Sequence, residues 1–501
     1  MSQERLLELW RPLHDLRMTR AVLEWDQETM MPPGGAAARA RALATLAGEV
    51  HARLVDDALH EAALRARDAA EEGSVEHAQA LVALRDVERA RRVPARLARE
   101  LAEATSAGLV SWQAARKESD FARFAPDLER IVRLKEEEAQ AVADGGRPYD
   151  ALLDEYEPGT READLVPLFE RIRAELSPRI RAVAESGVVV DESPAQGQFP
   201  EAHQRALGLA ASRAIGFDHD AGRLDLAAHP FCTSFSPRDV RITWRFQEDD
   251  FRPALYGILH ESGHGLYEQG LPLEWEGQPL GEAAGLGIHE SQSRLWENAV
   301  GRSRGFLRWL AVPWREAFGA PMPDVEELWP ALHTCRPSLI RVEADESTYD
   351  LHVLVRFELE RRLFSGELAT ADLPAAWNGA YEEVLGLRPA NDAEGVLQDI
   401  HWAMGAFGYF PTYTLGNLMA AQLFAAAGAE LGDLEAAFAA GEFAPLREWL
   451  REKVHRHGRR WRSAELVERA SGRPLTPDDH LARLAEQVET VYGVTVGGAT
   501  G

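Results

Sequence analysis

Two histidines four residues apart, with a glutamate beside the first, are the residues of this 501-residue chain whose types and spacing could do chemistry. They stand in the segment His260-Glu261-Ser262-Gly263-His264. If the segment is helical, both imidazoles lie on one face and can bind one divalent cation. Glu261, about 100° further round the helix, can then act on a water molecule at that cation. The segment is typical of a metal-dependent hydrolase, although so short a motif is only moderately specific.

The surrounding sequence predicts a helix that carries the motif. Asp249 and Asp250 provide an acidic N-terminal start, and Pro253 suits a first helical turn. Gly270 and Pro272 end the pattern. Between these limits apolar residues recur at helical spacing, namely Leu255, Ile258, Leu259 and Leu266.

A second helical pattern, which starts at His289-Glu290 after the glycine-rich residues 281–287, supplies a further carboxylate. A carboxylate on a second helix is the usual third ligand of such a site, so we assign Glu290 to the metal beside His260 and His264. Three protein ligands leave the fourth coordination position open for water, as a catalytic zinc site requires. His289 is expected to pack beside the site and not to bind the metal.

Further motifs stand before and after these two helices. They are His229-Pro230-Phe231, Asp239-Val240-Arg241-Ile242-Thr243, Ile340-Arg341-Val342-Glu343-Ala344-Asp345, and Gly395 followed by Gln398-Asp399-Ile400-His401-Trp402. With these motifs, in this order, the chain resembles the M32 family of metallocarboxypeptidases, the thermostable carboxypeptidase type. The resemblance runs from about residue 146 to about residue 420.

The resemblance implies a zincin-like peptidase with a deep cleft between helical lobes that admits short peptides. It also implies broad specificity, poor action on C-terminal proline, and a homodimer. The expected cofactor is one Zn²⁺ per chain, with Co²⁺ or Mn²⁺ as alternatives, and it would acidify water and polarise the scissile carbonyl. Glu261 is expected to be the general base that takes the water proton and passes it to the leaving amine. The competing interpretation is that these helix-face residues only form ion pairs.

The tetrahedral intermediate also needs a hydrogen-bond donor from the protein. His401 and the tyrosines of the segment after it are the candidates. Related helical zinc peptidases place a histidine and a tyrosine about ten residues apart for this purpose, which favours Tyr413 and keeps Tyr409 as a substitute. Both tyrosines could instead pack a helix junction. Asp399 is expected to orient His401 or a metal-bound histidine.

An exopeptidase needs a cation for the substrate's terminal carboxylate. Arg341 is the leading candidate, because a guanidinium offers a planar fork and the resemblance places this arginine at the C-terminal end of the substrate. The alternative is an intrahelical ion pair with Asp345, four residues further on. Arg241 and His229 either line the substrate channel or only organise a hairpin.

The composition, rich in Ala, Leu, Glu and Arg, predicts an all-α, mainly helical fold. A strand-like passage over Leu224–Phe235 and Val240–Phe246 predicts a small β-hairpin or sheet beside the active-site cleft. Its edge strand could hold an extended peptide substrate. We expect one peptidase domain over residues 1–501, with an N-terminal helical region 1–145, a catalytic core 146–430 and C-terminal helices 431–501.

The net charge of −26 disfavours nucleic acid and anionic membranes as partners. No signal-peptide pattern and no long apolar run is present, so a cytoplasmic protein is expected. Cys232 and Cys335 are too few for a disulfide framework and are interpreted as small buried hydrophobic residues. Peptides are the expected substrates because the family resemblance implies them.

Two other functions stay open from the sequence. A helical zinc endopeptidase or dipeptidyl carboxypeptidase would share the two-helix metal site, and its products would distinguish it. A helical scaffold with a structural zinc is the non-enzyme alternative. Structural sites normally complete four protein ligands, however, and would not need Glu261.

Overall fold

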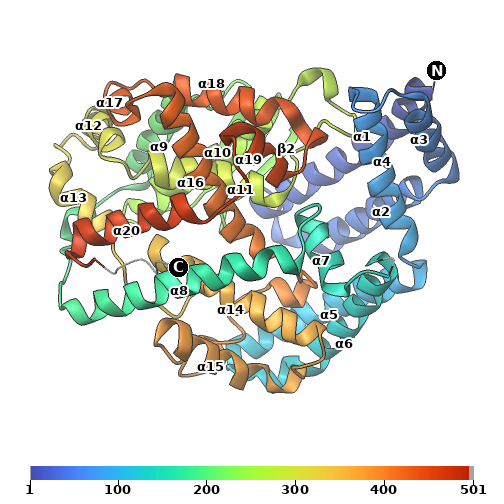
Figure 1. Ribbon diagram of the computed structural model, residues 1–501, viewed down its shortest axis with the longest axis horizontal. Coiled ribbons are helices and arrows are strands. Elements are labelled where there is room, and N and C mark those ends of the chain that lie inside the picture. The colour runs from blue at the N-terminus through green and yellow to red at the C-terminus, as the bar shows by residue number, and fades with distance from the viewer. Residues whose placement is uncertain (1, 144, 496–501) are drawn as a thin grey trace. The chain divides into compact units, whose positions relative to one another are not determined.

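The computed structural model describes residues 2–143 and 145–495, and helices make up most of them, so the prediction of a mainly helical fold is confirmed (Figure 1). The described residues form two compact units, each built from separate stretches of the chain. The first unit takes its residues from Met1–Arg91, Glu192–Leu332 and Met419–Leu475. The second takes them from Arg92–Asp191, His333–Leu418 and Thr476–Gly501. The predicted regional boundaries at residues 145 and 430 stay a prediction.

The first unit begins with a helical subassembly, drawn in blue in Figure 1. The long helix α1 (Ser2–Thr29) packs against α2 (Ala36–Leu54) and α3 (Asp57–Ala69), and α4 (Val75–Arg92) follows. Their apolar faces share one buried core. Its larger members are Leu6, Trp10, Leu13, Leu59, Leu84 and Val87.

A small sheet in the first unit has the strand order β1-β3-β2. The strands β2 (Cys232–Ser236) and β3 (Asp239–Trp244) form the predicted antiparallel hairpin, but β1 (Gly222–Leu226) pairs with β3 in parallel. The expectation of one continuous strand over Leu224–Phe235 is therefore wrong. The chain leaves the sheet around Pro230, which lacks the N–H that a strand interior needs.

The sheet packs against the helix that carries the H-E-x-x-H motif. This helix, α10 (Arg252–Gly270), contacts β2, β3 and α9 (Glu201–Ile215) as well as α11 (Leu286–Arg294). The predicted helix around the motif is thus confirmed. The other elements of this unit are α12 (Arg304–Phe318), α13 (Val325–Leu332), the larger part of α16 (Pro411–Leu431), α17 (Leu434–Ala439), α18 (Ala444–Lys453), α19 (Ser463–Ser471), a π-helix (Leu295–Val300) and short 3-10 helices at Pro33–Gly35, Ser193–Ala195, Leu273–Trp275 and His455–Arg460.

The second unit is built around α14 (Glu346–Phe364), which is buried on nearly all sides. It contacts α8 (Glu162–Ser186) and α15 (Leu373–Leu385), and α20 (Asp478–Tyr492), red in Figure 1, runs beside the green α8. The remaining elements are α5 (Ala95–Glu118), α6 (Phe121–Ala143), α7 (Pro148–Tyr156), the first turns of α16 (Pro411–Leu431), and 3-10 helices at Arg341–Glu343, Thr370–Asp372 and His401–Met404.

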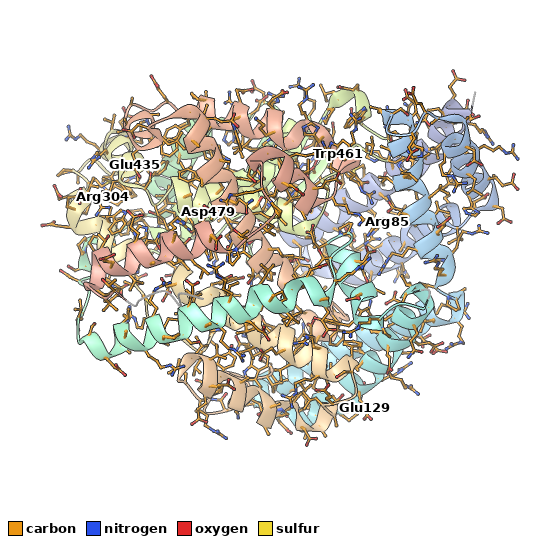
Figure 2. The ribbon with its side chains drawn as sticks, viewed as in Figure 1. Arg85, Glu129, Arg304, Glu435, Trp461 and Asp479 are labelled. Carbon is orange, nitrogen blue, oxygen red and sulfur yellow. The ribbon has the colours of Figure 1, made fainter. Side chains whose placement is uncertain are left out.

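Charged side chains such as Glu129 project from the helices into solvent (Figure 2). Acidic residues outnumber basic ones by 81 to 55, so the exposed helix faces carry the chain's negative charge. Within residues 2–143 and 145–495, no helix combines the length and the apolar character needed to cross a bilayer. Cys335 is buried as expected, whereas Cys232 is partly exposed.

Candidate functional site

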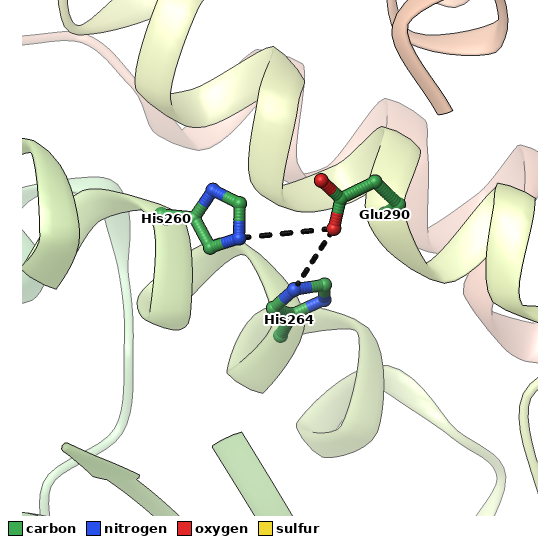
Figure 3. Close-up of side chains that lie close together, drawn as sticks. All are labelled: His260, His264 and Glu290. Carbon is green, nitrogen blue, oxygen red and sulfur yellow. Dashed lines mark ion pairs between the residues drawn. The ribbon is translucent and has the colours of Figure 1, made fainter. Parts of the chain in front are cut away.

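The side chains of His260, His264 and Glu290 converge on one point in the first unit (Figure 3). The two histidines come from α10 and the glutamate from α11. The Nε2 atoms of His260 and His264 lie 3.7 and 3.4 Å from Oε2 of Glu290. All three potential ligand atoms lie within 4.8 Å of one another. Two imidazole nitrogens and one carboxylate oxygen at this separation fit a single divalent cation.

The close approach of α10 and α11 depends on Gly263. A Cβ atom at this position would lie 2.5 Å from the carbonyl oxygen of Gln292 and 2.6 Å from Cα of Ser293. Any larger residue would therefore push the two helices apart. The glycine inside the H-E-x-x-H segment brings the histidine face of α10 within reach of Glu290.

Hydrogen bonds on the far side of each ring orient the two imidazoles. Nδ1 of His260 lies 2.8 Å from Oε2 of Glu297, and Nδ1 of His264 lies 3.1 Å from the carbonyl oxygen of His289. Both partners are acceptors, so each ring, when it is neutral, carries its proton on Nδ1 and leaves the Nε2 lone pair free for a cation. That tautomer is the one that metal binding requires.

Glu297 is a residue of this site that the sequence analysis missed. It lies in the π-helix Leu295–Val300 that continues α11, and π-turns inside helices are frequent at functional sites. Burial raises its pKa, but the His260 hydrogen bond and the nearby Arg294 and Arg302 outweigh burial and lower the pKa of Glu297 to about 2. The signal that could have found it is its helical spacing, because an acidic residue seven positions after Glu290 shares its face of the helix.

Glu290 is held by its own helix. Arg294 donates from Nε to Oε1 at 2.7 Å, and the Ser293 hydroxyl donates to Oε2 at 3.2 Å. Burial opposes ionisation, but Arg294 and His260 hold the pKa of Glu290 well below its usual range. The carboxylate is therefore ionised and oriented, as a metal ligand must be.

Glu261 has the opposite electrostatic character. Its side chain is 6 % exposed. Burial raises the pKa of Glu261 to about 7, with Glu290 adding to the shift and His260 opposing it. A carboxyl group with a pKa near neutrality can accept and release a proton under ordinary conditions, which suits a general base.

A second group of predicted residues lies in the second unit around Arg341. Its Nε and Nη2 atoms donate to Oδ1 of Asp399 at 3.0 and 2.8 Å, and Nη1 donates to the Tyr349 hydroxyl at 2.8 Å. The alternative of an intrahelical pair with Asp345 is wrong, because Arg341 lies in a separate 3-10 helix before α14. Asp345 instead caps α14 by accepting from the Thr348 amide at 3.0 Å.

His401 and Tyr413 lie close together in the same unit. Nε2 of His401 is 3.3 Å from the Tyr413 hydroxyl, and the Tyr409 ring lies 5.2 Å from the His401 ring between centroids. Asp399 accepts from Arg341 and also, at 2.7 Å, from Nε of Arg356. The expected role of Asp399 in orienting a histidine stays a prediction, and its observed hydrogen bonds go to the two arginines.

Arg241 and His229 belong to the sheet region of the first unit. Arg241 on β3 forms two hydrogen bonds of 3.0 Å to Asp239 and lies over the rings of Trp25 and Phe235, at 4.2 and 4.7 Å from their centroids. His229 is exposed in the connection between β1 and β2. These contacts organise the hairpin, and a substrate-binding role for either residue stays a prediction.

The family model for the carboxypeptidase Taq (M32) metallopeptidases matches residues 5–488 of this chain. The chain belongs to the M32 family. The predicted resemblance is confirmed over almost the whole length and not only over the motif-bearing part. This M32 protein is therefore an enzyme, a metal-dependent peptide hydrolase of the carboxypeptidase class.

Individual relatives agree with the family match. Thermostable carboxypeptidase 1 of Thermus thermophilus is 46% identical, with 98% of this chain and 99% of the relative covered. Carboxypeptidase 1 of Bacillus subtilis is 36% identical, with 94% and 95% covered. The crystal structure of an M32 carboxypeptidase from Deinococcus radiodurans has a TM-score of 0.94 at 42% identity, with 98% of this chain and all of that chain covered. The M32 fold is thus shared along the full chain.

Replacing Glu297 by glutamine tests its role in orienting His260. The amide keeps the shape but loses the charge that holds the Nδ1 proton, so metal affinity should fall by about 10- to 100-fold. Competition against a chromophoric chelator measures the dissociation constant. Glu326→Gln is the matched control, because Glu326 is an exposed partner of Arg304 and should leave metal affinity unchanged. Equal affinity in the Glu297 variant and the wild type would contradict the role.

Proposed function

We propose that this M32 enzyme releases single residues from the C-termini of short peptides, with broad side-chain tolerance and poor action on C-terminal proline. The convergence of His260, His264 and Glu290 beside Glu261 carries the proposal, because this set combines a cation site with a base. Zinc is the proposed cation, and cobalt or manganese are alternatives for the same ligand set. Once bound, it supplies an acidified water molecule and polarises the scissile carbonyl.

Glu261 is the proposed general base. It takes the proton of the attacking water and later delivers it to the leaving amine. The raised pKa of about 7 supports both steps, since the carboxylate is a strong enough base to accept the proton and a strong enough acid to release it. Glu297 and the His289 carbonyl keep the two imidazoles in the tautomer that the site needs.

His401 and Tyr413 are the proposed donors to the oxyanion of the tetrahedral intermediate, with Tyr409 as the substitute for Tyr413. The 3.3 Å contact between Nε2 of His401 and the Tyr413 hydroxyl supports a paired action. Burial lowers the pKa of His401 to about 4, so the ring is neutral and can donate from one nitrogen. A neutral donor stabilises the oxyanion without giving up its proton.

Arg341 is the proposed partner of the substrate's terminal carboxylate. Arg341 and Arg356 share one carboxylate, Asp399, so this buried group carries an excess positive charge. A buried positive charge that is not fully neutralised favours the binding of an anion such as a carboxylate. The guanidinium of Arg341 also lies 5.0 Å from the ring centroid of Tyr413. Arg241 and His229 are proposed to line the path of the peptide.

The proposal includes a homodimer in the cytoplasm that binds peptides and neither nucleic acid nor membranes. The family resemblance supports the dimer. The net charge of −26 supports the absence of polyanionic partners, because like charges repel.

The products of one unblocked peptide test the reaction direction. We expect a ladder of fragments, each one residue shorter at the C-terminus, that stops before a C-terminal proline. A chelator should abolish hydrolysis, and added zinc or cobalt should restore it. Mass spectrometry of the time course identifies the fragments. Products shortened by two residues would instead indicate a dipeptidyl carboxypeptidase, and internal fragments an endopeptidase.

Two substitutions separate the base from the metal ligands. Glu261→Gln should keep the metal while kcat falls by about 10² or more, because only proton transfer is lost. Glu290→Ala should lose metal, because it removes a ligand. Metal analysis of the purified variants alongside steady-state kinetics distinguishes the two. Loss of metal in Glu261→Gln, or full occupancy in Glu290→Ala, would reverse the assignments.

Substrate amidation and Arg341→Ala should remove the same interaction. A charge-assisted contact of about 1.5–3 kcal/mol predicts that either change lowers kcat/KM by roughly 10- to 150-fold. The two changes together should cost little more than one, because paired effects are not additive. Arg341→Lys should recover only part of the loss, since an ammonium lacks the bidentate fork.

Arg362→Ala, an exposed arginine of the same unit, is the control and should keep full discrimination between free and amidated peptides. Undiminished discrimination in Arg341→Ala would transfer the role to another cation, with Arg241 the next to test. Equal cleavage of free and amidated peptides by the wild type would instead exclude the exopeptidase reaction.

A further inference from the structure

A fully buried carboxylate in the second unit receives three hydrogen bonds and has no part in the chemistry proposed above. Glu360 on α14 is 0 % exposed. Its Oε1 accepts from Nε1 of Trp402 at 2.8 Å, and its Oε2 accepts from the backbone amide of Gly408 at 2.8 Å and the Tyr149 hydroxyl at 2.9 Å. One side chain thus joins α7, α14 and the segment that carries His401.

The bonds to Glu360 hold the chain on the C-terminal side of His401. Trp402 directly follows the histidine, and Gly408 directly precedes Tyr409. On the other side, Asp399 accepts from Nε of Arg356 at 2.7 Å, and Arg356 lies one turn before Glu360 on the same helix. His401 therefore lies between two points of attachment to the buried polar face of α14.

Gly408 leaves the segment no alternative path. Its φ of +82° is in the left-handed region, and a Cβ atom there would lie 2.7 Å from the carbonyl carbon and oxygen of Leu152 in α7. The backbone at this point lies directly against a helix backbone, and its amide points at Glu360. The Gly408 amide therefore reaches the Glu360 carboxylate only while the turn keeps this conformation.

We propose that Glu360 is a positioning residue that fixes the His401 imidazole for catalysis, an inference that rests on the role proposed for His401. A carboxylate is required because all three partners donate, and Trp402 and the Gly408 amide cannot accept. In glutamine one of the two oxygens becomes an NH₂ group. Whichever way this amide is turned, its NH₂ faces Trp402 or the Gly408 amide, so one buried bond is lost.

The test compares Glu360→Gln with Glu358→Gln. Glu358 lies two residues away on α14 and pairs with Arg173 at 3.5 Å near the surface, which makes it a control of identical chemistry. Both proteins are labelled with ¹³C at histidine Cε1, and the signal that disappears in His401→Ala identifies His401. We expect the His401 signal to move in Glu360→Gln and to stay in Glu358→Gln. Burial raises the pKa of Glu360 to about 7, so spectra are recorded at pH 8, where the carboxyl is ionised.

Kinetics provide the second readout. Glu360→Gln should lower kcat by about 10- to 100-fold, the scale of a misplaced catalytic group, with KM little changed. The same substitution in a His401→Ala background should cause no further loss, because it acts through that ring. Metal content should equal that of the wild type. A loss of kcat that is the same with and without His401 would overturn the proposal, since it would mean a general defect.

The two readouts separate this inference from the proposed function. If the wild type releases no C-terminal residue, the proposed function fails, while the His401 signal still tests the positioning. An unmoved signal in Glu360→Gln overturns the positioning whatever the activity. If Glu360→Gln does not fold, Trp402→Phe, which removes one donor and keeps the carboxylate, is measured instead. An unmoved His401 signal in that variant likewise overturns the proposal.

Discussion

The geometry of the metal centre depends on placing three carboxylates, the buried Glu261 and Glu290 and the partly exposed Glu297, around two imidazoles. Burying an ionised carboxylate costs several kcal/mol unless a cation accompanies it. Arg294 pairs with Glu290 and Arg302 with Glu297, and a third positive charge comes from His260. Burial lowers the pKa of His260, but Glu290, Glu297 and Glu261 outweigh burial and raise that pKa to about 9. A divalent ion at the convergence of the ligand atoms would replace the proton on His260, because the ring must be neutral to bind the ion. Metal and proton are therefore alternative ways to satisfy the same constraint.

The sequence predicts the helix of this centre well because a single physical rule controls it. Imidazoles four residues apart share a face in any α-helix, so the spacing of His260 and His264 fixes their relation. The limits of α10 follow from Pro253 and Gly270, whose backbone preferences are local. The position of Glu290 beside the two histidines was accessible too, because it is a carboxylate at the start of the next helical pattern.

Other parts of the site were not accessible because their causes are tertiary. Helical spacing places Glu297 on the face of Glu290, but its bond to His260 links residues 37 positions apart, which no spacing rule predicts. The parallel pairing of β1 with β3 depends on how the chain returns to the sheet at Asp239. Arg341 has Asp399, 58 residues away, as its partner and not the nearby Asp345. Residue spacing predicts a local ion pair of Arg341 with Asp345, but tertiary packing places Asp399 beside Arg341 instead.

In the second unit, the buried polar side chains that need hydrogen-bond partners include several residues of α14. Its buried polar residues recur at helical spacing, and each bonds to a residue outside the helix: Tyr349 to Arg341, Arg356 to Asp399 and Glu360 to Trp402 and Gly408. Replacing buried ion pairs by well-packed apolar residues of the same volume is often neutral or stabilising, because burial of charged groups has a large desolvation cost. Stability alone therefore gives little reason for this polar face.

Hydrogen bonds differ from apolar contacts in being directional, so each of these residues fixes where its partner lies and not merely that it is buried. Directional hydrogen bonds can hold the side chains of His401, Arg341 and Tyr413 in defined orientations, and apolar contacts of the same stability would not.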